Sequence, residues 1–183
     1  FYKKGAEFSV QQNIALGNQS YDNRFLAVDM EWAFAQSDID IKDRIPRTRI
    51  DLVLVDTIPN EQGLNDIYLA ELKVGTVATE GTSGTIDHVE KTFKLINTEK
   101  ACQDLKEDVT NIINVKSELG IYTGTAKQFN LADKPKMMLI LAYRGEEEYK
   151  RLLKDSTAAQ EKAKELGMDE IKVVMHNALI KLD

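Results

Sequence analysis

The chain has 183 residues, 43% hydrophobic and 30% charged, which is enough for one folded domain with a substantial core. A formal net charge of −6 argues against a protein that covers nucleic acid with a broad basic surface, although it leaves room for a site whose carboxylates bind a metal. With no membrane-length apolar run, no signal-peptide pattern and a single cysteine, Cys102, we expect a cytoplasmic protein without an internal disulfide.

We expect residues 1–183 to form a single domain, and the first residue, Phe1 rather than Met, is compatible with a fragment of a longer protein. The first predicted element is a short helix over residues 4–17. Glu7 and Ile14 recur at helical spacing and therefore share a face. Glu7 is either a solvated surface residue or an acidic group that the helix brings to a site.

Residues 24–36 alternate between large apolar side chains and small or acidic ones, which is the period of a strand. One face of this strand is predicted to consist of Leu26, Val28, Met30, Trp32 and Phe34. The other face carries Asp29 and Glu31, which either face solvent or, in the case of Glu31, bring a further carboxylate toward the next strands.

A basic, proline-containing segment follows this strand. Its cations Lys42, Arg44, Arg47 and Arg49 form a local excess in an acidic chain and lead directly into the next apolar run. They either pair with the aspartates of the same segment in a solvated loop or contact a phosphate backbone.

Two short apolar runs, residues 49–56 and 67–75, are joined by a segment rich in turn-forming residues, which predicts a β-hairpin. Both runs are apolar on both faces, so we expect central strands covered on each side. Asp51, Glu71 and Lys73 lie within them, and burying such groups is costly unless they pair or bind a metal. They form either a structural ion cluster or a site for Mg²⁺ or Mn²⁺, where a neighbouring lysine supports phosphodiester hydrolysis.

The rest of the chain predicts a long helical stretch over residues 86–119, with a break near Asn97. A buried strand over residues 137–143, a helix over 146–167 and a last strand over 171–180 are predicted to follow. The last three elements have the spacing of a parallel strand–helix–strand unit. His88 lies in the first turn of the long helical stretch. It is either a capping or surface residue, or a group that binds phosphate or orients water.

The pattern D-(x19)-E-x-K formed by Asp51, Glu71 and Lys73, set across a hairpin and followed by a helix, resembles the PD-(D/E)xK nuclease superfamily. Ile50 stands where the family pattern has a proline. The resemblance is detailed over residues 49–75 and extends loosely, through the order of elements, over most of the chain. It implies a restriction-endonuclease-like α/β fold, in which helices flank a mixed sheet of antiparallel hairpin strands and a parallel strand–helix–strand unit.

The resemblance implies a nuclease that uses Mg²⁺ or Mn²⁺ to hydrolyse phosphodiester bonds, with DNA as the expected substrate, and it is compatible with a homodimer. The expected catalytic residues are Asp51, Glu71, Lys73, Glu7 and His88. The expected metal ligands are Asp51, Glu71 and Glu31. The basic residues named above are expected to bind nucleic acid. The alternative is a module that keeps the fold and binds nucleic acid or protein without cleavage. The acidic net charge favours this alternative, whereas the intact Asp/Glu/Lys set favours the enzyme.

Overall fold

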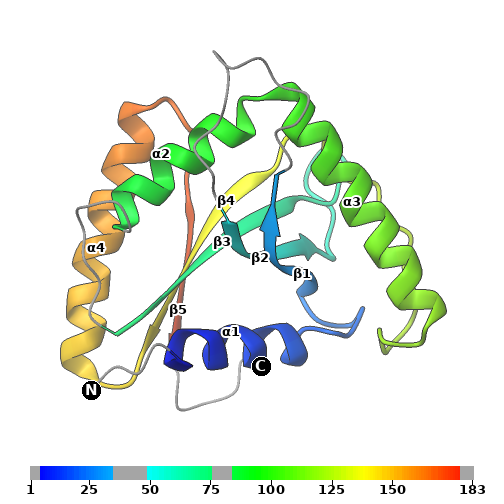
Figure 1. Ribbon diagram of the computed structural model, residues 1–183, viewed down its shortest axis with the longest axis horizontal. Coiled ribbons are helices and arrows are strands. Elements are labelled where there is room, and N and C mark those ends of the chain that lie inside the picture. The colour runs from blue at the N-terminus through cyan, green and yellow to red at the C-terminus, as the bar shows by residue number, and fades with distance from the viewer. Residues whose placement is uncertain (1–4, 35–48, 76–83, 178–183) are drawn as a thin grey trace.

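The structure is a computed structural model that describes residues 5–34, 49–75 and 84–177. Within these ranges the chain forms helices and strands in the order α1 (Gly5–Gly17), β1 (Phe25–Ala33), β2 (Arg49–Asp56), β3 (Ile67–Val74), α2 (Thr85–Ile96), α3 (Glu99–Glu118), β4 (Lys136–Tyr143), α4 (Glu146–Glu165) and β5 (Lys172–Asn177) (Figure 1). None of the helices in the described ranges is both long enough and apolar enough to cross a membrane.

The strands form one mixed sheet in the order β1-β2-β3-β4-β5. β2 pairs antiparallel with β1 and β3, whereas β4 pairs parallel with β3 and β5. The predicted hairpin and parallel strand–helix–strand unit are therefore confirmed, and so is the general α/β class. The long helical stretch is divided into α2 and α3 at Asn97 and Thr98, as the sequence predicts.

The sheet is covered by helices on both faces, so β2 and β3 are buried as expected for central strands. On one face Leu52, Leu54 and Leu72 pack in a cluster with Ile14 of α1. The opposite face packs against α2 and α3 through one hydrophobic cluster and against α4 through another. Figure 1 shows α1 apart from the arch formed by α2 and α3. Side chains alternate between the two faces along a strand. Because Leu72 packs on the α1 side, its neighbours Glu71 and Lys73 point toward the face that α2 covers.

β1 departs from the single apolar face that its sequence predicts. Its pairing with β2 shifts register between Ala27 and Asp29, and Met30 then packs in the α1-side cluster rather than with Val28. Glu31 adopts a positive φ of 60°, after which Trp32 returns to the α3 side and donates a hydrogen bond to Asp108 over 3.0 Å. The extra residue and the left-handed backbone each reverse the direction of the side chains that follow.

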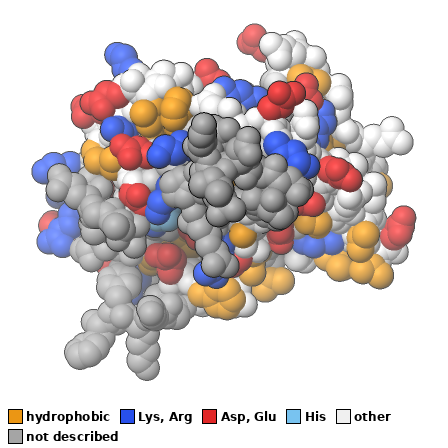
Figure 2. Space-filling model, turned by 45° about the horizontal axis from the view of Figure 1, so that its top comes forward, with side chains coloured by type: hydrophobic (Ala, Val, Ile, Leu, Met, Phe, Trp, Pro, Cys, Tyr) orange, Lys and Arg blue, Asp and Glu red, His pale blue; other side chains and the backbone are white. Residues whose placement is uncertain are grey.

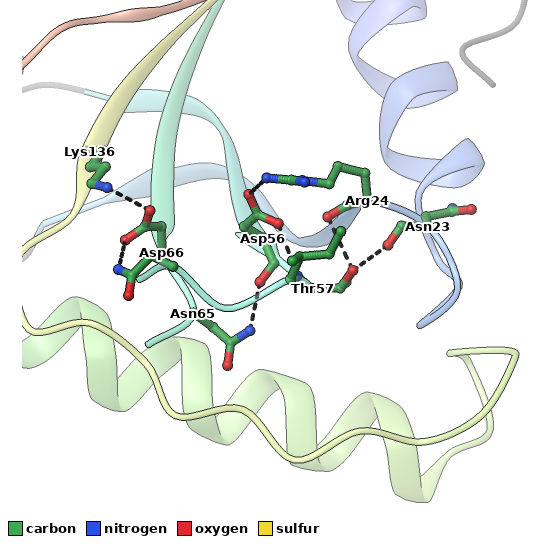
Figure 3. Close-up of polar contacts among 9 residues, drawn as sticks. Asn23, Arg24, Asp56, Thr57, Asn65, Asp66 and Lys136 are labelled. Atoms are coloured by element: carbon green, nitrogen blue, oxygen red, sulfur yellow. Dashed lines mark hydrogen bonds and ion pairs between the residues drawn. The ribbon is translucent and has the colours of Figure 1, made fainter. Parts of the chain in front are cut away.

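The connection between β2 and β3 is anchored by two buried carboxylates at the far end of β2 from Asp51 (Figure 3). Asp56 pairs with Arg24 over 2.7 Å, and its carbonyl oxygen accepts a hydrogen bond from Asn65 over 2.9 Å. Asp66 pairs with Lys136 of β4 over 2.6 Å. Both carboxylates have cationic partners, so the removal of one partner would leave an uncompensated buried charge at the turn end of the hairpin.

Candidate functional site

Asp51 lies where β2 diverges from β3. The pairing of these strands ends at Leu52 opposite Ala70, while β2 continues to pair with β1 as far as Arg49. Beyond that point the Asp51 carboxylate accepts a hydrogen bond through Oδ2 from the backbone N–H of Leu72, over 2.7 Å. The fork between the strands therefore fixes the side chain of Asp51 against β3.

Glu71 and Lys73 of β3 are two residues apart on a strand and share a face. Their side chains are only 5% and 11% exposed, and Lys73 Nζ lies 2.5 Å from Glu71 Oε1. His88 of α2 places Nδ1 3.0 Å from the same oxygen. One buried carboxylate is thus held by an ammonium group from its own strand and by an imidazole from the covering helix.

The charges of this cluster shift one another's protonation. The pKa of Asp51 is raised to about 7, chiefly by burial and further by the nearby negative charge of Glu71, while the Leu72 N–H and Lys73 oppose the shift. Burial tends to lower the pKa of Lys73, but its interactions with Glu71 outweigh burial, so the net pKa lies above its usual value. Lys73 therefore stays protonated, and Asp51 is the residue of this cluster whose ionised form is disfavoured.

α1 brings two further polar residues to this region. Burial raises the pKa of Glu7, and its carboxyl interacts electrostatically with Lys73, Glu71, His88 and Glu31. The helix that the sequence predicts to carry an acidic residue therefore places it within electrostatic range of the Glu71 carboxylate. The role of Glu7 in chemistry stays a prediction.

Gln11, also in α1, is a site residue that sequence reasoning missed. Its side chain is buried, and Nε2 donates hydrogen bonds to the Asp51 carbonyl oxygen over 2.5 Å and to Glu31 Oε1 over 3.0 Å. No role is predicted for this neutral residue from the sequence. The available signal was its place one helical turn after Glu7, on the inward side of the helix.

The structure brings together Asp51, Glu71 and Lys73 with His88 and Glu7. Glu31 also lies near this group of side chains, but its carboxylate contacts Gln11 and, over 2.7 Å, the guanidinium of Arg49. Lys42, Arg44 and Arg47 of the predicted nucleic-acid-binding set lie outside the described residues. Among the described residues, no group of three or more His, Cys, Asp or Glu side chains is arranged to hold a metal ion.

The surface charge is mixed. On the visible part of the face in Figure 2, Lys and Arg side chains are interspersed with Asp and Glu, without a continuous basic field. This distribution agrees with the acidic net charge of the chain. Nucleic-acid binding by this face would therefore depend on a few local cations rather than on a broad positive potential.

Comparisons of the chain with protein-family models, curated proteins and solved structures found no match. The arrangement of the residues themselves therefore carries the functional argument.

Proposed function

We propose that this chain is a metal-dependent nuclease of the PD-(D/E)xK type, with a restriction-endonuclease-like fold, that hydrolyses phosphodiester bonds, and that DNA is its substrate. One observation carries the proposal. The Glu71 carboxylate, on the central strand β3, is held by Lys73 of the same strand and by His88 of α2. The Asp51 carboxylate is fixed on β3 by the N–H of Leu72, at the fork of the sheet.

The donor set fits a hard divalent cation. Mg²⁺ commonly binds through one or two carboxylates and completes its shell with water and substrate phosphate, so two protein ligands suffice. Within the described ranges, the polar contacts of Asp51 fall on Oδ2 and those of Glu71 on Oε1, which leaves Oδ1 and Oε2 for other ligands. Burial is the main reason that the pKa of Asp51 is raised, and a bound cation would offset the repulsion from Glu71 that adds to it.

Lys73 has a separate task in this proposal. A protonated lysine donates hydrogen bonds and cannot act as a metal ligand. Its ammonium group, fixed by Glu71, is suited to hold an attacking water or to stabilise negative charge that grows on the phosphate. A bound Mg²⁺ or Mn²⁺ would supply the acidification of water and the neutralisation of phosphate charge.

His88 and the basic segment complete the proposed site. His88 contacts the carboxylate of Glu71 and so supports its orientation, and its side chain stays 19% exposed, which leaves access for phosphate or water. Lys42, Arg44, Arg47 and Arg49 are proposed to contact the phosphate backbone away from the scissile bond.

The decisive experiment combines metal binding with cleavage. Calorimetric titration with Mn²⁺ should show binding by the wild type and strongly reduced binding by Asp51→Asn and Glu71→Gln, while Asp133→Asn, at an exposed site, serves as the control. Plasmid DNA, linear DNA and RNA are incubated with Mg²⁺ or Mn²⁺. Cleavage of RNA but not DNA would correct the substrate. A protein that binds metal and cuts neither would instead be a nuclease-fold binding module.

A further inference from the structure

Gln11 connects α1 to two strands at the fork of the sheet. The residue is 3% exposed, and its Nε2 group donates to one acceptor on β2 and to another on β1, namely the Asp51 carbonyl oxygen and Glu31 Oε1. The two N–H groups of a glutamine amide can serve two acceptors at once. A buried amide used in this way fixes the relative positions of the groups that it joins.

The contact with Asp51 matters because of what lies at the other end of that residue. Its carboxylate accepts a hydrogen bond from Leu72 of β3, while its carbonyl oxygen accepts one from Gln11 of α1. Asp51 is therefore held at both its backbone and its side chain. Loss of the Gln11 contact would free the backbone at the point where β2 leaves β3.

Glu31 anchors the other side of the Gln11 amide. It is the one non-glycine residue with positive φ among the described residues, and such a backbone persists only where its surroundings hold it. Its Oε1 accepts from Gln11 and its Oε2 from Arg49, over 3.0 and 2.7 Å. Both carboxylate oxygens are thus engaged by protein groups, which favours an anchoring role over the metal-ligand role considered for Glu31 from the sequence.

From these contacts we infer that Gln11 is a positioning residue that holds Asp51 in register for the site, with Glu31 as its anchor rather than as a metal ligand. The consequence for metal binding rests on the proposed function. The geometric part, the alignment of Asp51 with Leu72, does not.

The test uses Gln11→Met, which keeps the length of the side chain and removes both donors, with Gln12→Met at an exposed neighbouring position as the matched control. In metal-free protein, the Leu72 amide proton should move upfield and exchange about 10-fold faster in Gln11→Met, because its hydrogen bond to Asp51 is weakened. Mn²⁺ affinity should fall about 10–100-fold, the usual cost of losing a group that orients a ligand. Gln12→Met should match the wild type in both measurements.

Glu31→Gln separates an anchor from a ligand. The new amide keeps an oxygen that can accept from Gln11, so Mn²⁺ affinity should fall by less than about 3-fold, whereas a lost carboxylate ligand costs far more. If Gln11→Met does not fold, Gln11→Asn, which keeps an amide too short to reach both acceptors, replaces it.

The outcomes are distinct. An unchanged Leu72 amide and unchanged Mn²⁺ affinity in folded Gln11→Met, even with a lower melting temperature, would show that Gln11 only packs and would overturn the inference. A loss of Mn²⁺ affinity above about 10-fold in Glu31→Gln, with the Leu72 amide unchanged, would make Glu31 a ligand and overturn its role as anchor. Wild-type protein that binds no Mn²⁺ would refute the proposed function, while the Leu72 amide would still decide the positioning of Asp51.

Discussion

The Asp51 carboxylate accepts a hydrogen bond from the backbone N–H of Leu72, on the neighbouring strand, over 2.7 Å. The contact forms where the regular pairing of β2 with β3 has ended, so a side chain takes the place of a backbone acceptor. It explains how an aspartate is accommodated at the start of a buried strand. It also means that the geometry of the proposed site and the divergence of the sheet depend on the same residue.

Asp51 should make the stability of the metal-free protein depend on pH. Its pKa is raised from 3.8 to about 7, so between these values the folded protein keeps a proton that the unfolded chain has released. The free energy of unfolding therefore falls as pH rises through this interval, and the full penalty remains above it. Asp51→Asn removes the penalty and should be more stable than the wild type by about 2–4 kcal/mol near pH 8, with the difference shrinking toward about pH 4.

Urea denaturation in EDTA at several pH values measures this difference. Asp133→Asn is the control, because a hydrogen bond from Lys106 lowers the pKa of the exposed Asp133 carboxyl, so any effect of that variant has the opposite sign. A stability difference between Asp51→Asn and the wild type that is constant with pH would contradict the raised pKa of Asp51.

Asp56, at the turn end of the hairpin, should contribute to stability without a role in chemistry. Asp56→Ala removes the partner of Arg24 and the acceptor for the Ile58 N–H, and should lower the free energy of unfolding by about 2 kcal/mol. Mn²⁺ affinity, measured well below the melting temperature, should equal that of the wild type. Asp56→Asn, which keeps an acceptor for Ile58, should lose less stability. Weakened metal binding in folded Asp56→Ala would show that the two ends of β2 are coupled.

The hairpin and its three charged residues were predictable because charge inside an apolar strand is a strong signal. Each of Asp51, Glu71 and Lys73 costs free energy when buried, so its presence in a central strand implies a partner. The spacing of apolar residues identified the order of the elements and the break near Asn97, within the long helical stretch. These features are local, and local patterns are what a sequence displays directly.

The contacts of α1 and the reversal of β1 were not predictable in the same way. Strict alternation in β1 predicts a continuous apolar face, but the register shift before Asp29 and the left-handed backbone of Glu31 depend on pairing with β2. Gln11 carries no charge, and its importance comes from acceptors 20 and 40 residues away. Such contacts arise only when distant segments pack together, so single-residue patterns do not reveal them.

The basic segment before β2 should act in binding rather than in chemistry. If Arg44 and Arg47 contact phosphates, the double variant Arg44→Gln/Arg47→Gln should weaken DNA binding and reduce the slope of log affinity against log salt by about 1 for each lost contact. Lys100→Gln on α3 is the control. Fluorescence anisotropy with Ca²⁺ in place of Mg²⁺, at several salt concentrations, gives the slope. An unchanged slope would show that the segment is solvated and does not touch DNA.

Lys73 should be required for rate and much less for metal binding. Lys73→Met preserves most of the side-chain volume but removes the ammonium group that lies 2.5 Å from Glu71. Cleavage should fall by about 10²–10³, the common cost of losing a donor that stabilises the transition state. The metal-free variant should also lose about 3 kcal/mol of stability, because Glu71 would then keep His88 as its one partner among the residues that the structure describes.

Without repulsion from the Lys73 ammonium group, Lys73→Met should bind Mn²⁺ at least as tightly as the wild type, so its melting temperature should rise at least as much on metal addition. Lys100→Met, which removes an exposed cation of α3, should leave cleavage and metal binding unchanged. Single-turnover cleavage, calorimetry and thermal denaturation separate the three effects. Full cleavage activity in Lys73→Met would place the active site elsewhere, whereas loss of both rate and Mn²⁺ affinity would assign Lys73 to the organisation of Glu71 rather than to the phosphate.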